Sequence, residues 1–263
     1  MSERLIELRN ITKSFGRVYA LGGVHLSIDK GEVVGLIGDN GAGKSTLIKI
    51  LAGVVKPTSG EILVRGKPVS GWNAARSREA GIETVFQDRA LAVQQSIVRN
   101  IFMGRELAGR FGWLKLAREV REAERLMREI GFTSRVFTPR SIVGQLSGGE
   151  RQGVAIARAI YNEADLIILD EPTTALSLTE TAKVFHFVRQ VRGSGRSILF
   201  IGHNIHHVYD IADRFVVLDR GQVVLETSRA EVRSADALIA FMQEVAHPEL
   251  PRASPAAPMR AAG

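Results

Sequence analysis

The chain has 263 residues, a formal net charge of +7, 45% hydrophobic and 24% charged residues, which are ordinary values for a globular protein with a packed core. It has no cysteine, which excludes disulfides, thiolate metal sites and cysteine catalysis and fits a reducing cytosol. No apolar run reaches the roughly 20 residues that span a bilayer, and residues 1–4 lack the order of a signal peptide. The positive charge suits nucleotide, anionic lipid or nucleic acid equally, and such an excess is more often a solvated surface.

The N-terminal part begins with stretches that alternate apolar and polar residues. Residues 5–9 and 24–28 both show this alternation, which predicts antiparallel strands. Residues 29–31 read Asp-Lys-Gly, which favours a turn. Residues 33–37 are then apolar throughout apart from one glycine, and this pattern predicts a buried strand.

A glycine-rich loop follows this strand at residues 38–46. It fits the pattern G-x-x-x-x-G-K-[ST], in which the loop ends on Gly43, Lys44 and Ser45. Glycines let backbone N–H groups turn toward phosphate oxygens, while Lys44 adds a point charge and Ser45 offers a hydroxyl to Mg²⁺. Residues 47–51 predict a helix whose N-terminus favours anions, so a chance glycine-rich turn is a poor explanation. The predicted phosphate-binding residues are Gly38, Asp39, Asn40, Gly41, Ala42, Gly43, Lys44, Ser45 and Thr46.

Beyond this phosphate-binding loop (P-loop), a short strand is predicted at residues 61–64, and from about residue 89 the pattern becomes helical. Apolar residues recur at helical spacing in residues 116–130 and 149–161. Strand character then returns in alternation with helices. The later strands are predicted at residues 166–169, 197–201, 214–219 and 222–225, with helices at 179–191 and 205–211.

Strands that alternate with helices favour a mainly parallel sheet covered on both faces. The predicted fold class is therefore α/β: a P-loop NTPase core with a mainly parallel sheet, N-terminal antiparallel β strands and an inserted helical subdomain. We expect the core in residues 1–88 and 163–246 and the helical subdomain in residues 89–162. Residues 247–263 combine Pro, Ala and Arg with nothing to bury, which predicts a disordered tail.

The strand predicted at residues 166–169 ends on two carboxylates, Asp170 and Glu171. In P-loop enzymes, such an Asp anchors the Mg²⁺ shell, usually through water, and an adjacent Glu can polarise the attacking water. The alternative is a strand followed by an ordinary acidic turn, which is common. We favour the roles in metal binding and water activation.

Residues 146–150 read Leu-Ser-Gly-Gly-Glu and open the helix at 149–161. A serine and two glycines at a helix start expose unpaired N–H groups that can bind an anion. Ser147 and Glu150 also have capping-box spacing, so an ordinary helix cap is the alternative, and both interpretations can hold together. With this motif between the P-loop and the strand-end carboxylates, the chain resembles the ATPase subunits of ATP-binding cassette (ABC) proteins. The resemblance implies that ATP is bound in trans by Leu146, Ser147, Gly148, Gly149 and Glu150.

Three further positions match the pattern of this family. Phe15 matches the aromatic residue that stacks on adenine, and Gln87 matches the glutamine that reaches Mg²⁺ and hinges the helical insert. His203 matches the switch histidine that contacts the γ-phosphate. The resemblance covers roughly residues 3–245 and implies ATP and Mg²⁺ as cofactors. The implied Mg²⁺ ligands are Ser45, Gln87 and Asp170, and the implied catalytic residues are Glu171, His203 and Gln87.

One position departs from the family pattern. Most members carry an Asp, which helps to couple the two nucleotide sites of the dimer, where this chain has Ser177. The departure bears on the strength of that coupling and not on ATP binding. We favour the interpretation that serine is a tolerated variant.

The wording of four stretches resembles one branch of the family, the ATPases of bacterial simple-sugar importers of the ribose and fructose type. These stretches are residues 38–43, 82–88, 100–106 and 202–205. The resemblance implies a homodimer of single-cassette chains that powers sugar uptake from the cytoplasmic face of the inner membrane, as a peripheral subunit. The implied partners are integral membrane permease subunits and, through them, a periplasmic or extracellular sugar-binding protein, with no nucleic acid.

Alternatives within the family stay open at this point. The chain could serve an exporter or an importer of another nutrient, or it could be a soluble ABC ATPase in cofactor assembly. The ABC ATPases of DNA repair and chromosome structure carry very long coiled-coil insertions before the Leu-Ser-Gly-Gly motif, and the sequence has no heptad pattern of that length.

Overall fold

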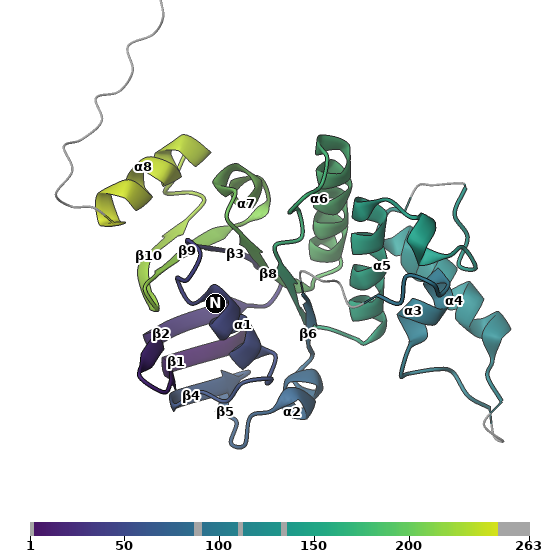
Figure 1. The fold of residues 1–263 in the computed structure, drawn as a ribbon, viewed down its shortest axis with the longest axis horizontal. Coiled ribbons are helices and arrows are strands. Elements are labelled where there is room, and N and C mark those ends of the chain that lie inside the picture. Colours follow the sequence, from purple (N-terminus) through teal and green to yellow (C-terminus); the bar gives the residue numbers. More distant parts are fainter. Residues whose placement is uncertain (1–2, 87–90, 110–112, 133–135, 247–263) are drawn as a thin grey trace, which may run out of the picture.

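A computed structural model describes residues 3–86, 91–109, 113–132 and 136–246, and these residues are arranged around two β-sheets (Figure 1). The smaller sheet is antiparallel and has the strand order β2-β1-β4-β5. Its long first pair confirms the predicted N-terminal antiparallel strands. The strands of this sheet are β1 (Arg4–Phe15), β2 (Val18–Asp29), β4 (Ser59–Val64) and β5 (Lys67–Pro68).

The larger sheet has six strands in the order β10-β9-β3-β8-β7-β6. All neighbours in it run parallel except β10, which pairs antiparallel with β9. The expected mainly parallel sheet is thereby confirmed. Its strands are β3 (Val33–Ile37), β6 (Ile82–Val85), β7 (Leu166–Asp170), β8 (Ser197–Gly202), β9 (Arg214–Asp219) and β10 (Gln222–Ser228).

Two apolar clusters hold the layers together. One cluster joins the smaller sheet to one face of the larger sheet, with α1 (Lys44–Leu51) buried between them. The other lies on the opposite face of the larger sheet, under α6 (Leu178–Gly193) and α7 (Ile205–Ile211), and includes residues next to and within α8 (Ala235–Ala246). Because both faces of the sheet are covered, its central strands are apolar without alternation, as in β3, where every residue is buried.

A helical region extends from the side of the larger sheet where β6 is the edge strand (Figure 1). Its apolar residues belong to the same cluster as those under α6 and α7, so one continuous core supports both. Helices α2 and α3 are too short to leave a helical pattern in the sequence, and neither was predicted. The helices between β5 and β7 are α2 (Ala74–Glu79), α3 (Ile97–Phe102), α4 (Leu116–Glu129), a 3₁₀ turn η1 (Val143–Gln145) and α5 (Gly148–Tyr161).

Backbone hydrogen bonds tie the segment after β6 to the segment before α5. Bonds of 2.7–3.0 Å join residues 93–98 to residues 139–144, including one from Gly144 N to Val93 O. The side chain of Asn100, which is fully buried, fixes the first of these segments, since its amide nitrogen donates to Ala92 O and Ser96 O at 3.0 Å. The two segments therefore form one unit.

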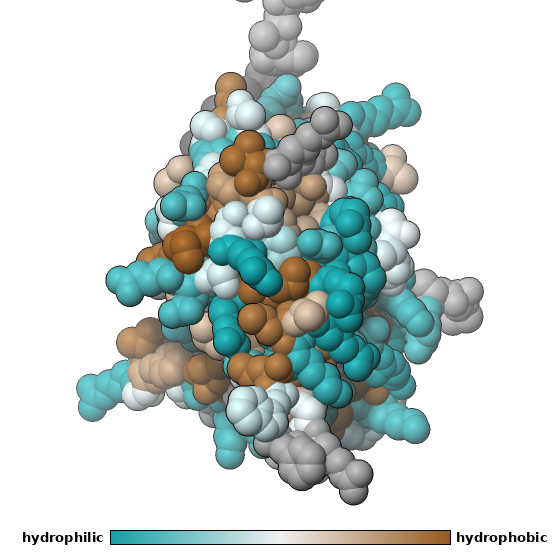
Figure 2. All heavy atoms as spheres, turned by 90° about the vertical axis from the view of Figure 1, so that its right-hand side faces the viewer, coloured by the Kyte–Doolittle hydropathy of each residue, from teal (hydrophilic) through white to brown (hydrophobic). Residues whose placement is uncertain are grey.

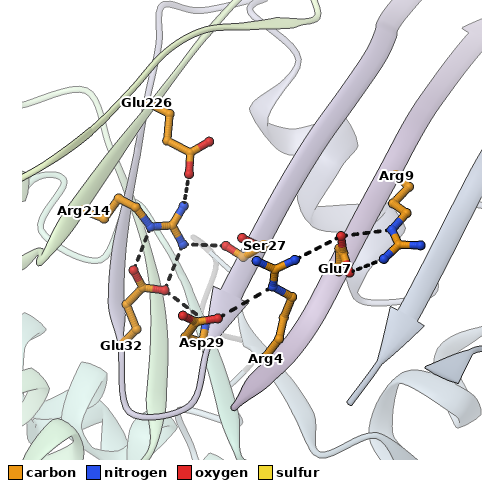
Figure 3. Close-up of polar contacts among 8 residues, drawn as sticks. All are labelled: Arg4, Glu7, Arg9, Ser27, Asp29, Glu32, Arg214 and Glu226. Atoms are coloured by element: carbon orange, nitrogen blue, oxygen red, sulfur yellow. Dashed lines mark hydrogen bonds and ion pairs between the residues drawn. The ribbon is translucent and has the colours of Figure 1, made fainter. Parts of the chain in front are cut away.

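At the amino-terminal end of β9 and beside the smaller sheet, charged side chains pair with one another (Figure 3). Arg214, at the start of β9, donates to both carboxylate oxygens of Glu32, at 2.7 and 2.8 Å. It also donates to Ser27 O at 2.6 Å and to Glu226 at 2.5 Å. These bonds connect β2 of the smaller sheet to β9 and β10 of the larger one. A neighbouring group in Figure 3 consists of Arg4, Glu7, Arg9 and Asp29.

The remaining sequence expectations fall partly outside the described residues. The tail predicted at residues 247–263 lies there, and so does Gln87. Helix α8, just before that tail, was not predicted. None of the helices in the described part of the chain is long and apolar enough to cross a membrane.

Candidate functional site

The carboxyl ends of three neighbouring parallel strands place the predicted residues at one edge of the larger sheet. Strand β8 lies between β3 and β7, with Ile37 opposite Gly202 and Asp170 opposite Ile201. The P-loop leaves β3, Glu171 follows β7 and His203 follows β8. This edge of a parallel sheet is where such folds bind ligands. The structure thus brings together three of the predicted groups, which lie far apart in the sequence.

The P-loop leads into α1, and no side chain caps the N-terminus of this helix. Gly43 is the N-cap, with φ of 107°, and no side chain accepts from the first N–H groups. A Cβ at this position would lie 2.8 Å from Ala20 O, so the backbone and the packing both require glycine. The first turn of α1 also lacks an acidic residue. Its N–H groups can therefore face an anion.

Lys44 turns back onto the P-loop. Its side chain is 6% exposed, and Nζ donates to Gly38 O at 2.6 Å and to Asp39 O at 2.9 Å. Both acceptors are neutral carbonyl oxygens. A phosphate oxygen carries charge and forms a stronger hydrogen bond with an ammonium group, so it would compete with these carbonyls for Lys44.

The two carboxylates after β7 have different surroundings. Burial raises the pKa of Asp170, the neighbouring Glu171 raises it further, and Lys44 and Lys49 act in the opposite direction. Since only β8 separates β3 from β7, the P-loop and the end of β7 belong to one site. Asp170 therefore occupies a position where a further positive charge would favour its ionised form.

Glu171 is held beside His203. Its backbone N–H donates to Ile201 O at 3.0 Å, and its φ is 46°, an uncommon value for a side-chain-bearing residue. The carboxylate accepts from Thr174 Oγ1 at 3.0 Å and lies 3.5 Å from Nδ1 of His203, whose side chain is 59% exposed. Glu171 thus faces the predicted switch histidine.

Two residues near Glu171 were missed by sequence reasoning. Thr174 orients the Glu171 carboxylate, and His207 Nδ1 lies 3.2 Å from Thr173 Oγ1, which ties α7 to the segment after β7. Burial lowers the pKa of His207. The sequence shows only that Thr174 and His207 lie within a few residues of Glu171 and His203. It does not show that their side chains point toward the segment after β7.

The Leu-Ser-Gly-Gly-Glu segment forms the start of α5 and does not join the P-loop. Ser147 accepts from Glu150 N at 3.3 Å, and Glu150 accepts from Ser147 N at 2.9 Å, which confirms the predicted capping box. Leu146 is buried. In the described part of the chain, the hydrogen bonds that this motif makes outside α5 run to Glu180 and Lys183 of α6 and to Val143, just before the motif. The structure therefore leaves the predicted trans-binding residues apart from the cis site.

Phe15 lies at the end of β1 with half of its surface exposed, 51%. Lys13 Nζ sits 4.9 Å from the centre of its ring. An exposed aromatic face is available for stacking on a planar ligand. The contact with Lys13 covers part of the ring and helps to hold it in place.

The available oxygen donors fit Mg²⁺ that is also held by phosphate. Ser45, exposed at the start of α1, and Asp170, at the end of β7, supply a hydroxyl and a carboxylate. Within the described residues there is no cluster of three His, Cys, Asp or Glu side chains that could hold a metal alone. Mg²⁺ commonly takes one or two protein ligands and completes its shell with water and phosphate oxygens, so this sparse donor set suits it.

Comparisons with known proteins find relatives that carry ATP-binding or ABC transporter names. A family model described as ABC transporter matches residues 21–174. The chain is 44% identical over 227 residues to the xylose/arabinose import ATP-binding protein of Sulfolobus acidocaldarius, with 86% of this chain and 89% of that protein covered. It is 41% identical over 242 residues to a ribose import ATP-binding protein of Burkholderia pseudomallei, which covers 90% of this chain. The chain spans 46% of that longer protein, about half its length.

Solved structures show the same fold. The dimeric structure of a post-hydrolysis state of an ATP-binding cassette, bound to ADP and Pi, superposes with a TM-score of 0.71 at 27% identity. The match covers 85% of this chain and 98% of that one. The predicted fold class, a P-loop α/β core with an antiparallel N-terminal sheet, agrees with this likeness and with the strand order described above.

Proposed function

This chain belongs to the ABC transporter family, and on that premise we propose that it binds and hydrolyses ATP to drive the import of a simple sugar through separate permease subunits. The observation that carries the proposal is the meeting of the P-loop, the Asp170-Glu171 pair and His203 at one edge of the sheet. The names of the two import relatives support a sugar as the cargo.

The residues of this edge divide the chemistry among themselves. The backbone N–H groups of the P-loop and the Lys44 ammonium bind the phosphates, and Phe15 stacks on the adenine. Ser45 and Asp170 hold Mg²⁺, which neutralises charge on the phosphates when bound. Glu171 accepts a proton from the attacking water, and His203, 3.5 Å from the Glu171 carboxylate, orients the γ-phosphate.

A homodimer completes each site. The Leu-Ser-Gly-Gly motif stands at the N-terminus of α5, where the positive end of the helix dipole favours an anion. The N–H groups of Ser147, Gly148 and Glu150 already bond to acceptors of their own chain, so ATP held by a second copy would share or displace these bonds. A related cassette is dimeric with ADP and Pi bound, which supports this arrangement. In the proposed head-to-tail dimer, Lys44 of one chain and Ser147 of the other hold the same ATP. ATP binding closes the dimer, and hydrolysis and product release open it.

Coupling to a permease uses the region after β6. Of the apolar residues in this region, Ile97, Ile101 and Phe102 are buried, whereas Val93 and Met103 are each 48% exposed. Figure 2 faces the end of the molecule that carries α3 and α4, where apolar patches alternate with charged side chains. Residues 93–98 are hydrogen-bonded to residues 139–144, which precede α5. Exposed apolar surface beside this bonded unit suits a permease contact on the cytoplasmic face of the membrane. A sugar-binding protein outside the membrane would act through that permease.

The test places charge on the exposed apolar residues. The double variant Val93→Asp/Met103→Asp is expected to retain the basal ATPase activity of the isolated chain and to lose sugar uptake and permease co-purification. Val54→Asp, at a 61% exposed site outside the helical region, is the matched control and should retain all three. Uptake at the normal rate in the double variant would contradict permease docking at this surface. Absence of ATP hydrolysis by the wild-type chain and its complex would contradict the proposed activity itself.

A further inference from the structure

Helices α5 and α6 begin side by side at the Leu-Ser-Gly-Gly motif. A Cβ at Gly149 would lie 2.8 Å from Glu180 O, and a Cβ at Gly148 would lie 2.4 Å from Leu176 Cδ2. Both distances are too short for a real side-chain atom. The two glycines therefore bring the first turn of α5 into close contact with the first turn of α6 and with the residue before its N-cap, in addition to any part that they play in binding an anion.

One carboxylate joins the two helix starts. Glu180 Oε1 accepts from Gly148 N at 2.6 Å, in the first turn of α5. Its Oε2 accepts from Ser177 N and from Ser177 Oγ, both at 3.0 Å, at the N-cap of α6. Hydrogen bonds from the Ser177 backbone and side chain and from the backbone of the glycine pair lower the pKa of Glu180, so it is ionised at neutral pH.

A second link runs beside the first. Lys183, one turn further along α6, donates to Glu150 Oε1 at 3.0 Å, and Glu150 belongs to the capping box of α5. The segment from Glu171 to Ser177 is short and internally bonded, with Thr174 on the Glu171 carboxylate. The start of α5 and Glu171 are thus connected within one chain by the hydrogen bonds of Glu180 to Gly148 and Ser177 and by the short backbone segment between Ser177 and Glu171.

We propose that Glu180 is a positioning residue that couples the two ATP sites of the dimer, because it fixes the trans-binding start of α5 to the segment that follows Glu171 of the cis site. The proposal rests on the proposed function, in which each chain serves one ATP through the P-loop and the other through α5. Movement of α5 on the partner's ATP would then shift the Glu171 segment of the same chain.

The proposal also gives a physical reason for Ser177. The serine hydroxyl caps α6 by accepting from Glu180 N at 3.3 Å, and it donates to Glu180 Oε2. An aspartate could still cap the helix, but it has no proton to donate and would set a second negative charge against Glu180. Ser177 therefore permits the Glu180 link, and the link takes over the coupling role of the aspartate that most family members carry.

The test compares two glutamates with similar local bonds. Glu231 also accepts from a serine N–H and hydroxyl, those of Ser228 at 2.8 and 3.0 Å. Within the described residues, its carboxylate otherwise bonds only to the neighbouring Thr227. In the full-length chain, Glu180→Ala should lower turnover at saturating ATP about tenfold and move the Hill coefficient for ATP from near 2 to near 1. Binding of fluorescent ADP to the P-loop should stay within about twofold, and Glu231→Ala should change none of these quantities.

Hydrogen exchange provides a readout that does not depend on activity. Glu180→Ala should speed amide exchange in residues 147–151 and 173–178 together, and Glu231→Ala should speed it in neither segment. Should Glu180→Ala fail to fold, Glu180→Gln preserves the side-chain size and loses one of the two acceptor oxygens, so it should show the same changes to a smaller extent. The double variant Ser177→Asp/Glu180→Ala installs the usual aspartate and should recover a Hill coefficient above that of Glu180→Ala.

The outcomes separate this proposal from the function on which it rests. A wild-type chain that hydrolyses ATP, with an unchanged Hill coefficient and unchanged exchange in Glu180→Ala, would overturn the role of Glu180 alone. A double variant no more cooperative than Glu180→Ala would overturn the replacement of aspartate by the Glu180 link. A wild-type chain and complex without ATP hydrolysis would overturn both proposals.

Discussion

The two ends of the strands in the six-stranded sheet differ in how their charged side chains are paired. At the start of β9, Arg214 is shared between Glu32, Glu226 and a backbone oxygen, and its side chain is 16% exposed (Figure 3). At the carboxyl ends of β3 and β7, Lys44 donates to neutral carbonyls, and burial disfavours the charge of Asp170. The first end satisfies its charges within the chain, whereas the second leaves them to be satisfied by a ligand.

This difference predicts which substitutions should affect stability and which should affect function. A charge with full partners contributes to folding, and its removal leaves those partners buried and unpaired. A charge with weak partners costs stability in the free chain and is available to a charged ligand. Substitutions at the two ends should therefore separate the two properties.

The largest effect is expected from Glu171→Gln at the ligand end. It removes the proton acceptor without changing the side-chain size, so turnover should fall by roughly 10²–10⁴, about 3–5 kcal/mol of barrier, while ATP binding remains. The variant should also trap an ATP-bound dimer, measurable by size-exclusion chromatography with ATP and Mg²⁺. The comparison variant is Lys44→Ala, which should weaken nucleotide binding itself. Turnover close to that of the wild type in Glu171→Gln would remove Glu171 from the catalytic role.

The next effect is expected at the other end of the strands, from Arg214→Ala. This change leaves the largely buried Glu32 carboxylate without its arginine partner, although the bond from Asp29 N remains. Hydrogen bonds to charged groups contribute about 1.5–3 kcal/mol to stability, so the free energy of unfolding should fall by about 2–3 kcal/mol. The matched control is Arg220→Ala, just after the same strand, where the side chain is 90% exposed. Denaturant unfolding should separate the two variants. Equal midpoints for Arg214→Ala and Arg220→Ala would contradict the contrast between the two ends.

The smallest effect is expected from Asp170→Asn in the absence of nucleotide and Mg²⁺. Burial raises the folded-state pKa of Asp170 above its unfolded value, so folding binds a proton and stability falls as pH rises from the unfolded to the folded pKa. Above the folded pKa this penalty is fully present. Asp170→Asn removes it, so the melting temperature at neutral pH should rise slightly and its advantage should disappear in acid. A lower melting temperature in the variant at neutral pH would show that the charge of Asp170 is stabilising.

Features that depend on one stretch of sequence were predicted well. The run of apolar residues at β3 gave a strand with the predicted bounds, because a strand buried on both faces needs no alternation. The spacing of Ser147 and Glu150 predicted a capping box that the structure contains. In both cases the physical cause lies within a few residues, and the sequence displays it directly.

Features that depend on distant partners were not predicted. Helix α3 has six residues, too few to show a period, and it is held by the buried side chain of Asn100 and by bonds to residues 139–141. The bond from Gly148 to Glu180 joins residues 32 positions apart. Neither residue type nor spacing indicates such a contact, because only the packing of α5 against α6 creates it. For the candidate site, the sequence named the P-loop, the Asp170-Glu171 pair and His203, which the structure brings together, and the structure added Thr174 and His207 near Glu171.

The place of β3 in the sheet has a consequence for the order in which the protein can be assembled on the ribosome. The strands of the smaller sheet all lie within residues 4–68, so they can pair while most of the chain is still unmade. Strand β3 is also made early, but its two neighbours are β8 and β9, at residues 197–202 and 214–219. Such non-local pairing forms slowly and late. A nascent chain that ends before β8 contains the complete P-loop sequence and no neighbouring strand to hold it, so the ability to bind ATP should arrive only near the end of synthesis.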